Sequence, residues 1–384
     1  MADLFGSDAV EEEDDIAPAE EYVEDELADE PEDLTPRTTP YFMGHHDTTE
    51  KALLRDFNAG RMPHAVVLAG ALGIGKATLA FRLARFLLAQ DDGGLFGGDA
   101  APVSSMDIAQ DHPAFRRVAS GGHPDLLVVG REIDEKRGKM KNDIAVDDVR
   151  RIHPFLRKTS SEGGWRIVIV DGGEYLNNSS QNALLKVLEE PPAKSMLIMT
   201  TTKPGAFLPT IRSRCRVLQM QPLEDETLSA LLDIYAPGTA AHEKDTLIRM
   251  ASGSIGRGLQ YCQDGVLDLY GELAKTVAGL PDIDMLAVHD LAERLGRGAT
   301  TDAYDAACDI LSGWCLQEAR AGARGTGVTD SPLSGLYTPR HSFEMWEKMT
   351  RLFQQVRSGN LDRRQGILGA FLMLKNPAYE GLAV

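Results

Sequence analysis

The chain has few cysteines and no segment long enough to cross a membrane. Four cysteines occur in 384 residues, and no two of them form a C-x-x-C pair. This set predicts neither a disulfide framework nor a zinc site, and it is typical of a reducing compartment. No apolar run approaches the ~20 residues of a transmembrane helix, and the acidic first residues do not resemble a signal peptide. We therefore expect a cytoplasmic protein without a membrane partner.

Positive charge is missing from the first 36 residues. They contain sixteen Asp or Glu residues and no Lys or Arg, so they carry most of the net charge of −18. A block of like charge with few apolar residues cannot bury enough surface to offset its chain entropy. The sequence predicts a disordered acidic tail over residues 1–40. Two roles are open for this tail, either to aid solubility or to dock weakly onto basic partners.

A hydroxyl is missing from the most recognisable motif of the chain. The segment Gly70 to Lys76 fits the first seven positions of the phosphate-binding pattern G-x-x-x-x-G-K-[ST], but the eighth position is Ala77. A methyl group cannot ligate the Mg²⁺ that Ser or Thr normally holds. Thr78 comes one position late, inside the expected helix, so its hydroxyl should miss the metal. The loop is therefore suited to cradle phosphate and poorly equipped to hydrolyse it.

The loop lies in the context that a phosphate-binding motif requires. Residues 65–69 form a short apolar run that predicts a buried strand, and apolar residues recur at helical spacing from Leu79 to Leu87. A helix N-terminus at this place offers N–H groups and a positive dipole end to phosphate. The predicted nucleotide-binding residues of the loop are Gly70, Gly73, Gly75, Lys76 and Thr78.

A second apolar strand supplies the acid expected near the loop. Residues 167–170 are β-branched and end in Asp171, where P-loop proteins place a carboxylate that contacts the Mg²⁺ shell. The next position, where an activating carboxylate would polarise the attacking water, is Gly172. Glu174 lies two residues further on, and we expect its side chain to point elsewhere. Groups needed for hydrolysis are thus missing at two positions, 77 and 172.

Strands and helices alternate in the first part of the chain, and helices prevail in the second. Alternation of this kind predicts a parallel sheet with helices on both faces. Residues 89–122 predict a glycine-rich loop insertion with a short helix, and helical patterning continues from about Val266 to the end. Further strands are expected at 125–129 and 196–199, and helices at 50–57, 144–156, 181–190, 224–235, 242–251 and 256–263.

Five motifs together resemble one known family, the clamp loader subunits of bacterial DNA polymerase III. They are residues 61–65 (RMPHA), 182–186 (NALLK), 188–192 (LEEPP), 213–215 (SRC) and 360–362 (NLD). The three central motifs occur in that family in this order and spacing. Among its subunits the chain resembles the delta-prime type, which does not hydrolyse ATP, because the active γ and τ subunits keep both missing groups.

The resemblance covers residues 41–384 and implies an AAA+ architecture of three parts. A RecA-like α/β nucleotide-binding domain is expected over 41–221, a small helical lid over 222–268, and an all-α collar domain for oligomerisation over 269–384. The implied function is to help load the sliding clamp onto primed DNA during replication. No ATPase activity of its own is expected.

The resemblance also implies roles for single residues. The arginine of the SRC motif acts in trans in this family, on the γ-phosphate of ATP held by a neighbouring subunit, and this role falls on Arg214. A planar, permanently charged fork suits an arginine finger, although Arg214 taken alone could equally form a surface ion pair. Thr201 or Thr202 occupies the sensor 1 region, where a hydroxyl could also simply cap a strand. Arg257 stands one place later than the sensor 2 arginine of γ.

The expected ligands and partners come from the same resemblance. ATP or ADP would bind without hydrolysis, and no zinc is expected because residues 89–122 lack the four cysteines that many relatives carry there. The expected partners are γ or τ and δ subunits, and through them the sliding clamp and primed DNA.

Two other functions remain open from the sequence. An active ATPase of the γ/τ type would need a hydroxyl at 77 and a carboxylate at 172, and the chain has neither. A nucleic-acid-binding module acting alone would need a surplus of Lys and Arg, whereas residues 37–384 carry a net charge of −2.

Overall fold

The computed structural model divides at the end of the acidic tail into two units, residues 1–35 and 36–384. The predicted disordered tail lies largely outside the residues that the structure describes, as does Asn360 of the NLD motif. The helices and strands assigned in the described residues all belong to the second unit. The described residues are 35–40, 46–90, 102–134, 139–161, 163–262, 265–297, 301–325, 329–357, 359 and 361–379.

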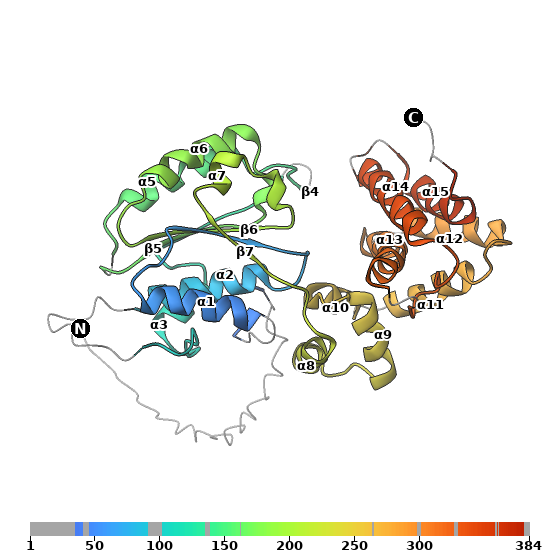
Figure 1. Ribbon diagram of the computed structural model, residues 1–384, viewed down its shortest axis with the longest axis horizontal. Coiled ribbons are helices and arrows are strands. Elements are labelled where there is room, and N and C mark those ends of the chain that lie inside the picture. The colour runs from blue at the N-terminus through green and yellow to red at the C-terminus, as the bar shows by residue number, and fades with distance from the viewer. Residues whose placement is uncertain are drawn as a thin grey trace, which may run out of the picture. The chain divides into compact units, whose positions relative to one another are not determined.

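A five-stranded sheet forms the centre of the first half of this unit (Figure 1). Its strands are β2 (Leu126–Val129), β5 (Arg166–Val170), β6 (Ser195–Thr201), β1 (Ala65–Ala69) and β7 (Arg216–Gln219), in this spatial order. Every neighbouring pair is parallel. The three inner strands are buried along their whole length, because their apolar side chains face helices on both sides. The predicted P-loop α/β fold is confirmed.

One face of the sheet is covered by α1 (His46–Asn58), α2 (Lys76–Leu88) and α3 (Pro113–Ala119) (Figure 1). Apolar residues at helical spacing on α1 and α2, such as Leu53 and Leu83, are fully buried. They belong to one hydrophobic cluster with side chains of β1, β5 and β6. This packing holds α2, and therefore the loop before it, firmly against the central strand.

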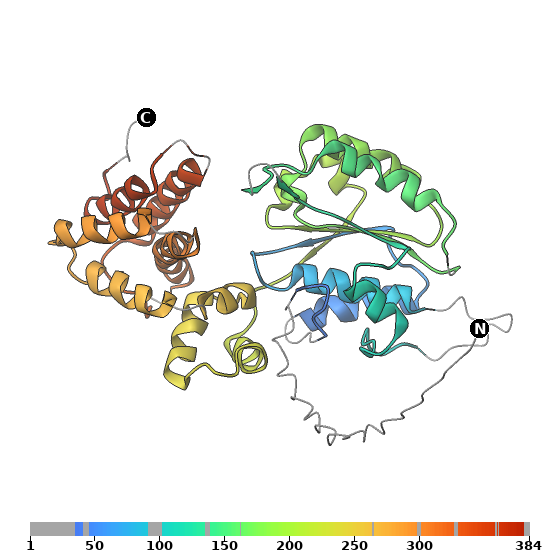
Figure 2. The same ribbon diagram turned by 180° about the vertical axis from the view of Figure 1, so that it is seen from behind.

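The opposite face carries α4 (Val146–Arg150), α5 (Ile152–Arg157), α6 (Asn178–Glu189) and α7 (Pro209–Arg212) (Figure 2). Their buried residues form a second cluster with the other face of the same strands. The helix predicted at 181–190 is therefore present as α6, with its start three residues earlier.

The single helix predicted over 144–156 is wrong. The structure has two short helices there, α4 and α5, which meet at Arg151. Pro154 explains the break, because a proline has no N–H to donate to the carbonyl of Arg150 and its ring crowds that carbonyl. In α5 Pro154 instead occupies the first turn, where a missing N–H costs little.

The edge strand β7 and a small hairpin were not predicted from the sequence. The edge strand β7 alternates between half-buried and exposed residues, so it lacks the apolar run that identifies the inner strands. A small antiparallel hairpin joins β3 (Ile133–Asp134) to β4 (Lys139–Met140) after β2. Both elements are short. Their strand conformation depends on pairing with another segment of the backbone, which a local sequence pattern does not reveal.

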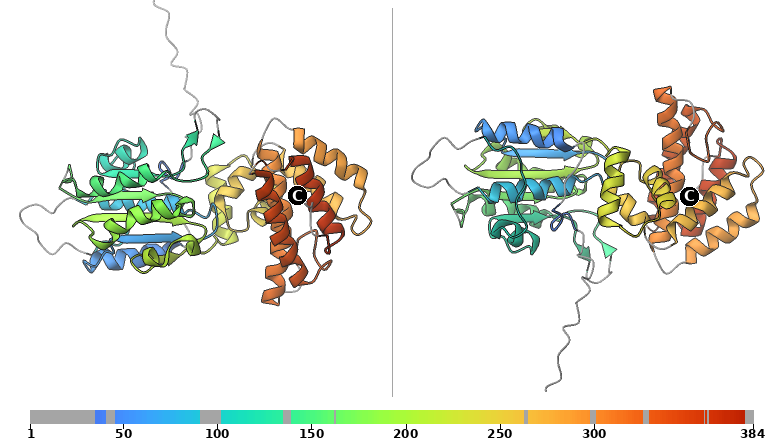
Figure 3. Two further views of the ribbon diagram at one scale, coloured as in Figure 1. Left: turned by 90° about the horizontal axis from the view of Figure 1, so that it is seen from above. Right: turned by 90° about the horizontal axis from the view of Figure 1, so that it is seen from below.

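Helices make up the described chain after β7. The first three are α8 (Asp225–Tyr235), α9 (Ala241–Ala251) and α10 (Ile255–Tyr261), close to the predicted bounds. Five longer helices follow, and Figure 3 shows α12 to α15 packed against one another. These five are α11 (Val266–Val277), α12 (Met285–Arg297), α13 (Thr301–Arg324), α14 (Pro339–Arg357) and α15 (Arg363–Lys375).

Buried side chains from α8 to α15 form one continuous hydrophobic cluster. The division into lid and collar at residue 268 therefore stays a prediction. None of the helices in the described part of the chain is long and apolar enough to span a membrane.

Candidate functional site

The phosphate-binding loop connects β1 to α2 at the carboxyl end of the sheet. Gly70 donates its backbone N–H to the carbonyl of Thr201 on the neighbouring strand, at 3.1 Å. A Cβ atom at Gly70 would lie 2.7 Å from both the Met220 carbonyl oxygen and Ile74. Gly75, the N-cap of α2, has a φ of +98°, a conformation that glycine adopts without steric penalty. The loop backbone therefore requires glycine at both positions.

Lys76 is turned onto its own loop. Its Nζ donates a hydrogen bond of 2.5 Å to the carbonyl oxygen of Ala71, and the residue is only 7% exposed. Burial lowers the pKa of Lys76, and the carboxylates of Glu174 and Asp171 oppose that shift. The structure thus brings Lys76 close enough to Asp171 and Glu174 for their negative charges to act on its ammonium group.

Asp171 follows β5 and is held by a hydroxyl of the next strand. Thr200 on β6 donates a hydrogen bond of 2.5 Å from Oγ1 to Oδ1 of Asp171, and the same hydroxyl accepts the N–H of Gly172 at 3.0 Å. The sequence predicts Thr201 or Thr202 for the sensor 1 region and does not identify Thr200. No local pattern in the sequence identifies Thr200, because it meets Asp171 only through the register of β5 and β6.

The turn after Asp171 decides where the next carboxylate lies. Gly172 has a φ of +84°, and a Cβ atom there would come within 2.8 Å of the Tyr175 ring. Residues 173–175 form a short 3₁₀ helix that carries Glu174. The negative charge of Glu174 acts on Lys76, although its carboxylate is hydrogen-bonded elsewhere, to Thr202.

Glu174 is held in place by Thr202. Its Oε1 accepts a hydrogen bond of 2.6 Å from Oγ1 of Thr202, and the backbone N–H of Thr202 donates to the same carboxylate. Burial would raise the pKa of Glu174, but these hydrogen bonds bring it below its usual range. A carboxylate with its oxygens engaged in this way is a fixed negative charge beside the loop and is poorly placed to activate water.

The first turn of α10 lies directly against the loop. The backbone N–H of Gly256 donates to the carbonyl of Gly73 at 3.0 Å, and a Cβ atom at Gly73 would meet Oγ of Ser254 at 2.4 Å. Ser254 caps the helix by accepting the N–H of Arg257. The approach of the two backbones depends on glycine at 73 and 256.

Arg257 lies close to α13. Burial raises the pKa of Asp309 on α13, and the positive charge of Arg257 opposes this shift. The Nε atom of Arg257 is buried, and its N–H donates to no acceptor in the part of the chain that the structure describes. Among the described residues, no hydrogen bond or ion pair joins the Arg257 side chain to the phosphate-binding loop.

The turn that carries Arg214 is anchored on both sides. Ser213 donates from its hydroxyl to the carbonyl of Thr210 at 3.2 Å, and the backbone N–H of Arg214 donates to Ile211 at 3.0 Å. Cys215 packs into the core beneath the sheet, and burial raises the pKa of its thiol to about 12. The SRC motif therefore consists of a capping residue, an outward arginine and a half-buried anchor.

The side chain of Arg214 is exposed and oriented. Its Nη1 donates to the carbonyl of Thr210 and its Nη2 to Oε1 of Glu189, both at 3.0 Å. The side chain is 37% exposed and that of Glu189 is 51% exposed. Neither partner belongs to the phosphate-binding loop, so the structure does not bring Arg214 together with the other predicted site residues.

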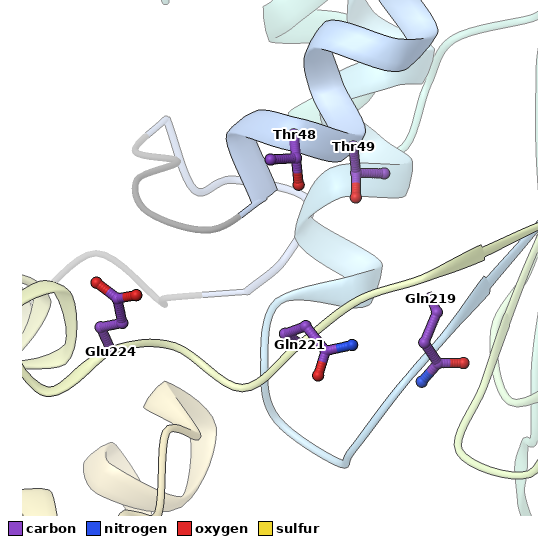
Figure 4. A pocket seen from close by; sticks show the side chains of 5 residues that line it. All are labelled: Thr48, Thr49, Gln219, Gln221 and Glu224. Carbon is purple, nitrogen blue, oxygen red and sulfur yellow. The ribbon is translucent and has the colours of Figure 1, made fainter.

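A polar pocket of about 400 Å³ lies between the start of α1 and the chain that follows β7 (Figure 4). None of the predicted site residues lines it. Within the described residues no group of three or more His, Cys, Asp or Glu side chains is arranged to hold a metal ion. The lining residues are Thr48, Thr49, Gln219, Gln221 and Glu224.

Comparisons with known proteins converge on one family. The model of the family described as DNA polymerase III, delta subunit, matches residues 45–224. DNA polymerase III subunit delta′ of Pseudomonas aeruginosa is 30% identical over 270 residues, which cover 70% of this chain and 76% of that protein. Subunit delta′ of Escherichia coli K12 is 30% identical over 218 residues, which cover 55% of this chain and 58% of that protein.

A more distant similarity extends to the tau subunits. DNA polymerase III subunit tau of Salmonella typhimurium is 29% identical over 227 residues, which cover 58% of this chain and 32% of that protein. The match to the Pseudomonas protein spans more than two thirds of both chains, and the parallel sheet, the loop and the SRC turn lie within the same fold. The chain therefore belongs to the DNA polymerase III delta′ subunit family.

Proposed function

We propose that this chain is the non-hydrolysing delta′ member of a clamp loader, which helps to place the sliding clamp on primed DNA. Its partners in this proposal are γ or τ and δ subunits. Membership of the delta′ family and similarity to tau support this role. The chain contributes a rigid α/β body and the exposed Arg214 to a neighbouring ATPase subunit.

The inactive site is argued from three features of the chain. Ala77 offers no hydroxyl for Mg²⁺, and the left-handed backbone at Gly172 disfavours a carboxylate at that position. Lys76 is already bonded to Ala71 and faces two carboxylates. ATP or ADP would bind here, if at all, without hydrolysis, and no zinc is proposed.

The trans role of Arg214 rests on one observation above all: an exposed, oriented guanidinium stands on a turn fixed by Ser213 and Cys215. A planar fork with a permanent charge can stabilise negative charge that develops on a phosphoryl group. Because its partners, Thr210 and Glu189, lie outside the chain's own loop, the charge is available to a site on another subunit.

The test is a reconstituted complex with the γ or τ and δ subunits of the same organism. Arg214→Ala should lower the rate of clamp loading on primed DNA by at least about tenfold, because a removed arginine finger costs orders of magnitude in turnover. Assembly, followed by size-exclusion chromatography, should be unchanged. Arg212→Ala is the matched control, because Arg212 is an exposed arginine on the same turn.

Two outcomes would contradict the proposal. Equal rates of clamp loading by wild type and Arg214→Ala would contradict the trans role of Arg214. ATP hydrolysis by the isolated chain that disappears in Lys76→Ala would instead identify an active ATPase of the γ/τ type.

A further inference from the structure

Within the described part of the chain the guanidinium of Arg214 has one charged partner, and that partner lies on a different element. Glu189 is the last residue of α6, 25 positions earlier in the chain, and its Oε1 accepts a hydrogen bond from Nη2 of Arg214. The second bond of the fork, from Nη1 to Thr210, lies within the turn itself. The direction of the side chain is therefore set by α6 as well as by its own turn.

The carboxylate of Glu189 stands where a helix disfavours it. The carboxyl end of a helix carries a partial negative charge, so acidic residues there cost free energy unless a cation offsets them. Two such residues, Glu189 and Glu190, end α6, and each has an arginine partner, Arg214 and Arg157 respectively. The end of α6 is thus a concentrated negative charge that attracts the guanidinium of Arg214.

The same helix also holds the beginning of the arginine turn. Near the start of α6, the buried side chain of Gln181 donates to the carbonyl of Ala206 and accepts the backbone N–H of Leu208 at 2.7 Å. Gln181 therefore fixes the chain just before α7, and Glu189 fixes the side chain just after it. One helix, α6, therefore sets the positions of both ends of the turn.

Resting on the proposed role of Arg214, we infer that Glu189 is a positioning residue for the arginine finger. It holds the guanidinium in one direction, so that little side-chain entropy is lost when the fork meets a phosphoryl group. The two bonds engage two of the five N–H donors of the fork, and three stay available for phosphate oxygens. An exposed ion pair of this kind contributes little to stability, which separates positioning from folding.

The experiment compares Glu189→Gln with Glu190→Gln in the reconstituted complex. Glu190 is the adjacent residue and pairs with Arg157 at 3.2 Å, so its variant removes a similar charge without touching Arg214. We expect Glu189→Gln to lower kcat for ATP hydrolysis by about two- to fivefold at low salt, with an unchanged KM for ATP. Glu190→Gln should match the wild type in both constants.

Two further readouts distinguish positioning from a merely structural role. High salt screens an exposed ion pair, so the difference between Glu189→Gln and wild type should shrink as salt rises. In the double variant with Arg214→Ala, the Glu189→Gln change should have no additional effect on kcat, because the group that it positions is gone. Thermal unfolding checks that both single variants fold.

The outcomes separate this inference from the proposal that it rests on. If Arg214→Ala lowers kcat but Glu189→Gln has the same kcat as Glu190→Gln, the role of Arg214 as the finger is supported. The positioning role of Glu189 is then wrong. A kcat above wild type for Glu189→Gln would also overturn it, because Glu189 would then compete with the phosphate. If Arg214→Ala has no effect, the proposed function itself fails.

Discussion

At Gly172 the backbone decides which residue can follow the acid at the end of β5. A φ of +84° lies in the left-handed region, where a side chain collides with the neighbouring carbonyl. The Tyr175 ring occupies the space that a Cβ atom would need. A carboxylate could therefore not be introduced at 172 without changing the turn that carries Glu174.

Gly172→Ala should lower the free energy of unfolding by at least about 1 to 2 kcal/mol, because the Cβ of alanine is strained in the left-handed conformation. Chemical denaturation followed by circular dichroism measures the change. Gly238→Ala is the control, because Gly238 has an ordinary φ and no atom within 4 Å of an added Cβ. Equal midpoints for the two variants would show that the turn relaxes without cost.

The sequence allowed the loop, Asp171 and Arg214 to be predicted as candidates, because their residue types and spacing carry the signal. The partners of these residues could not be predicted. Thr200 meets Asp171 only because β5 and β6 are neighbours in register, and Glu174 meets Thr202 only because a 3₁₀ turn follows Gly172. Contacts of this kind depend on the tertiary fold and leave no local pattern in the sequence.

Among the elements, α10 and the phosphate-binding loop form a direct backbone contact. The hydrogen bond from Gly256 to Gly73 requires that neither residue has a side chain, because a Cβ atom at Gly256 would lie 3.0 Å from Cα of Gly73. The loop is thereby tied to a helix that follows the sheet in the chain.

Gly256→Val should separate α10 from the loop, because a branched side chain cannot fit in that space. Hydrogen exchange should become faster in peptides that cover residues 253–260 and in those that cover the loop. Gly271→Ala, on α11 with open space around it, serves as the control and should leave both peptides unchanged. Unchanged exchange in Gly256→Val would mean that the contact is not maintained in solution.

The elements that the sequence predicted best are those with the strongest local pattern. The strand expected at 65–69 is β1 without change, because a continuous apolar run fits a strand buried on both faces. The edge strand β7 was not predicted because it has no continuous apolar run. Val217 faces solvent instead of a helix and is 42% exposed. The break between α4 and α5 had a signal in Pro154, which the apolar periodicity of 144–156 concealed.

On the scale of the whole molecule, the hydrophobic cores are separate. Two clusters lie on the two faces of the sheet, and the third comprises buried side chains of α8 to α15. A change in one core therefore acts first on the elements that share it. Leu273 on α11 and Ile169 on β5 are both fully buried, each in a different core.

Leu273→Ala should destabilise the helical part by about 2 to 5 kcal/mol, since it removes buried methyl groups and leaves a cavity. Hydrogen exchange in partly denaturing conditions should show lost protection in α11 to α15 and little change in β1 and β5. Ile169→Ala should give the reverse pattern. Equal loss in both regions for both variants would show that the cores unfold as one cooperative unit.

The two outermost strands of the sheet, β2 and β7, have four residues each, and charged groups flank them. Asp125 precedes β2 and is bonded to Arg166 at 2.7 Å, and Arg216 opens β7 in an ion pair with Asp56. Short strands beside charges are poor templates for backbone pairing with another copy of the chain. The sheet therefore offers little opportunity for edge-to-edge aggregation, so we expect the free subunit to stay in solution until its partners are present.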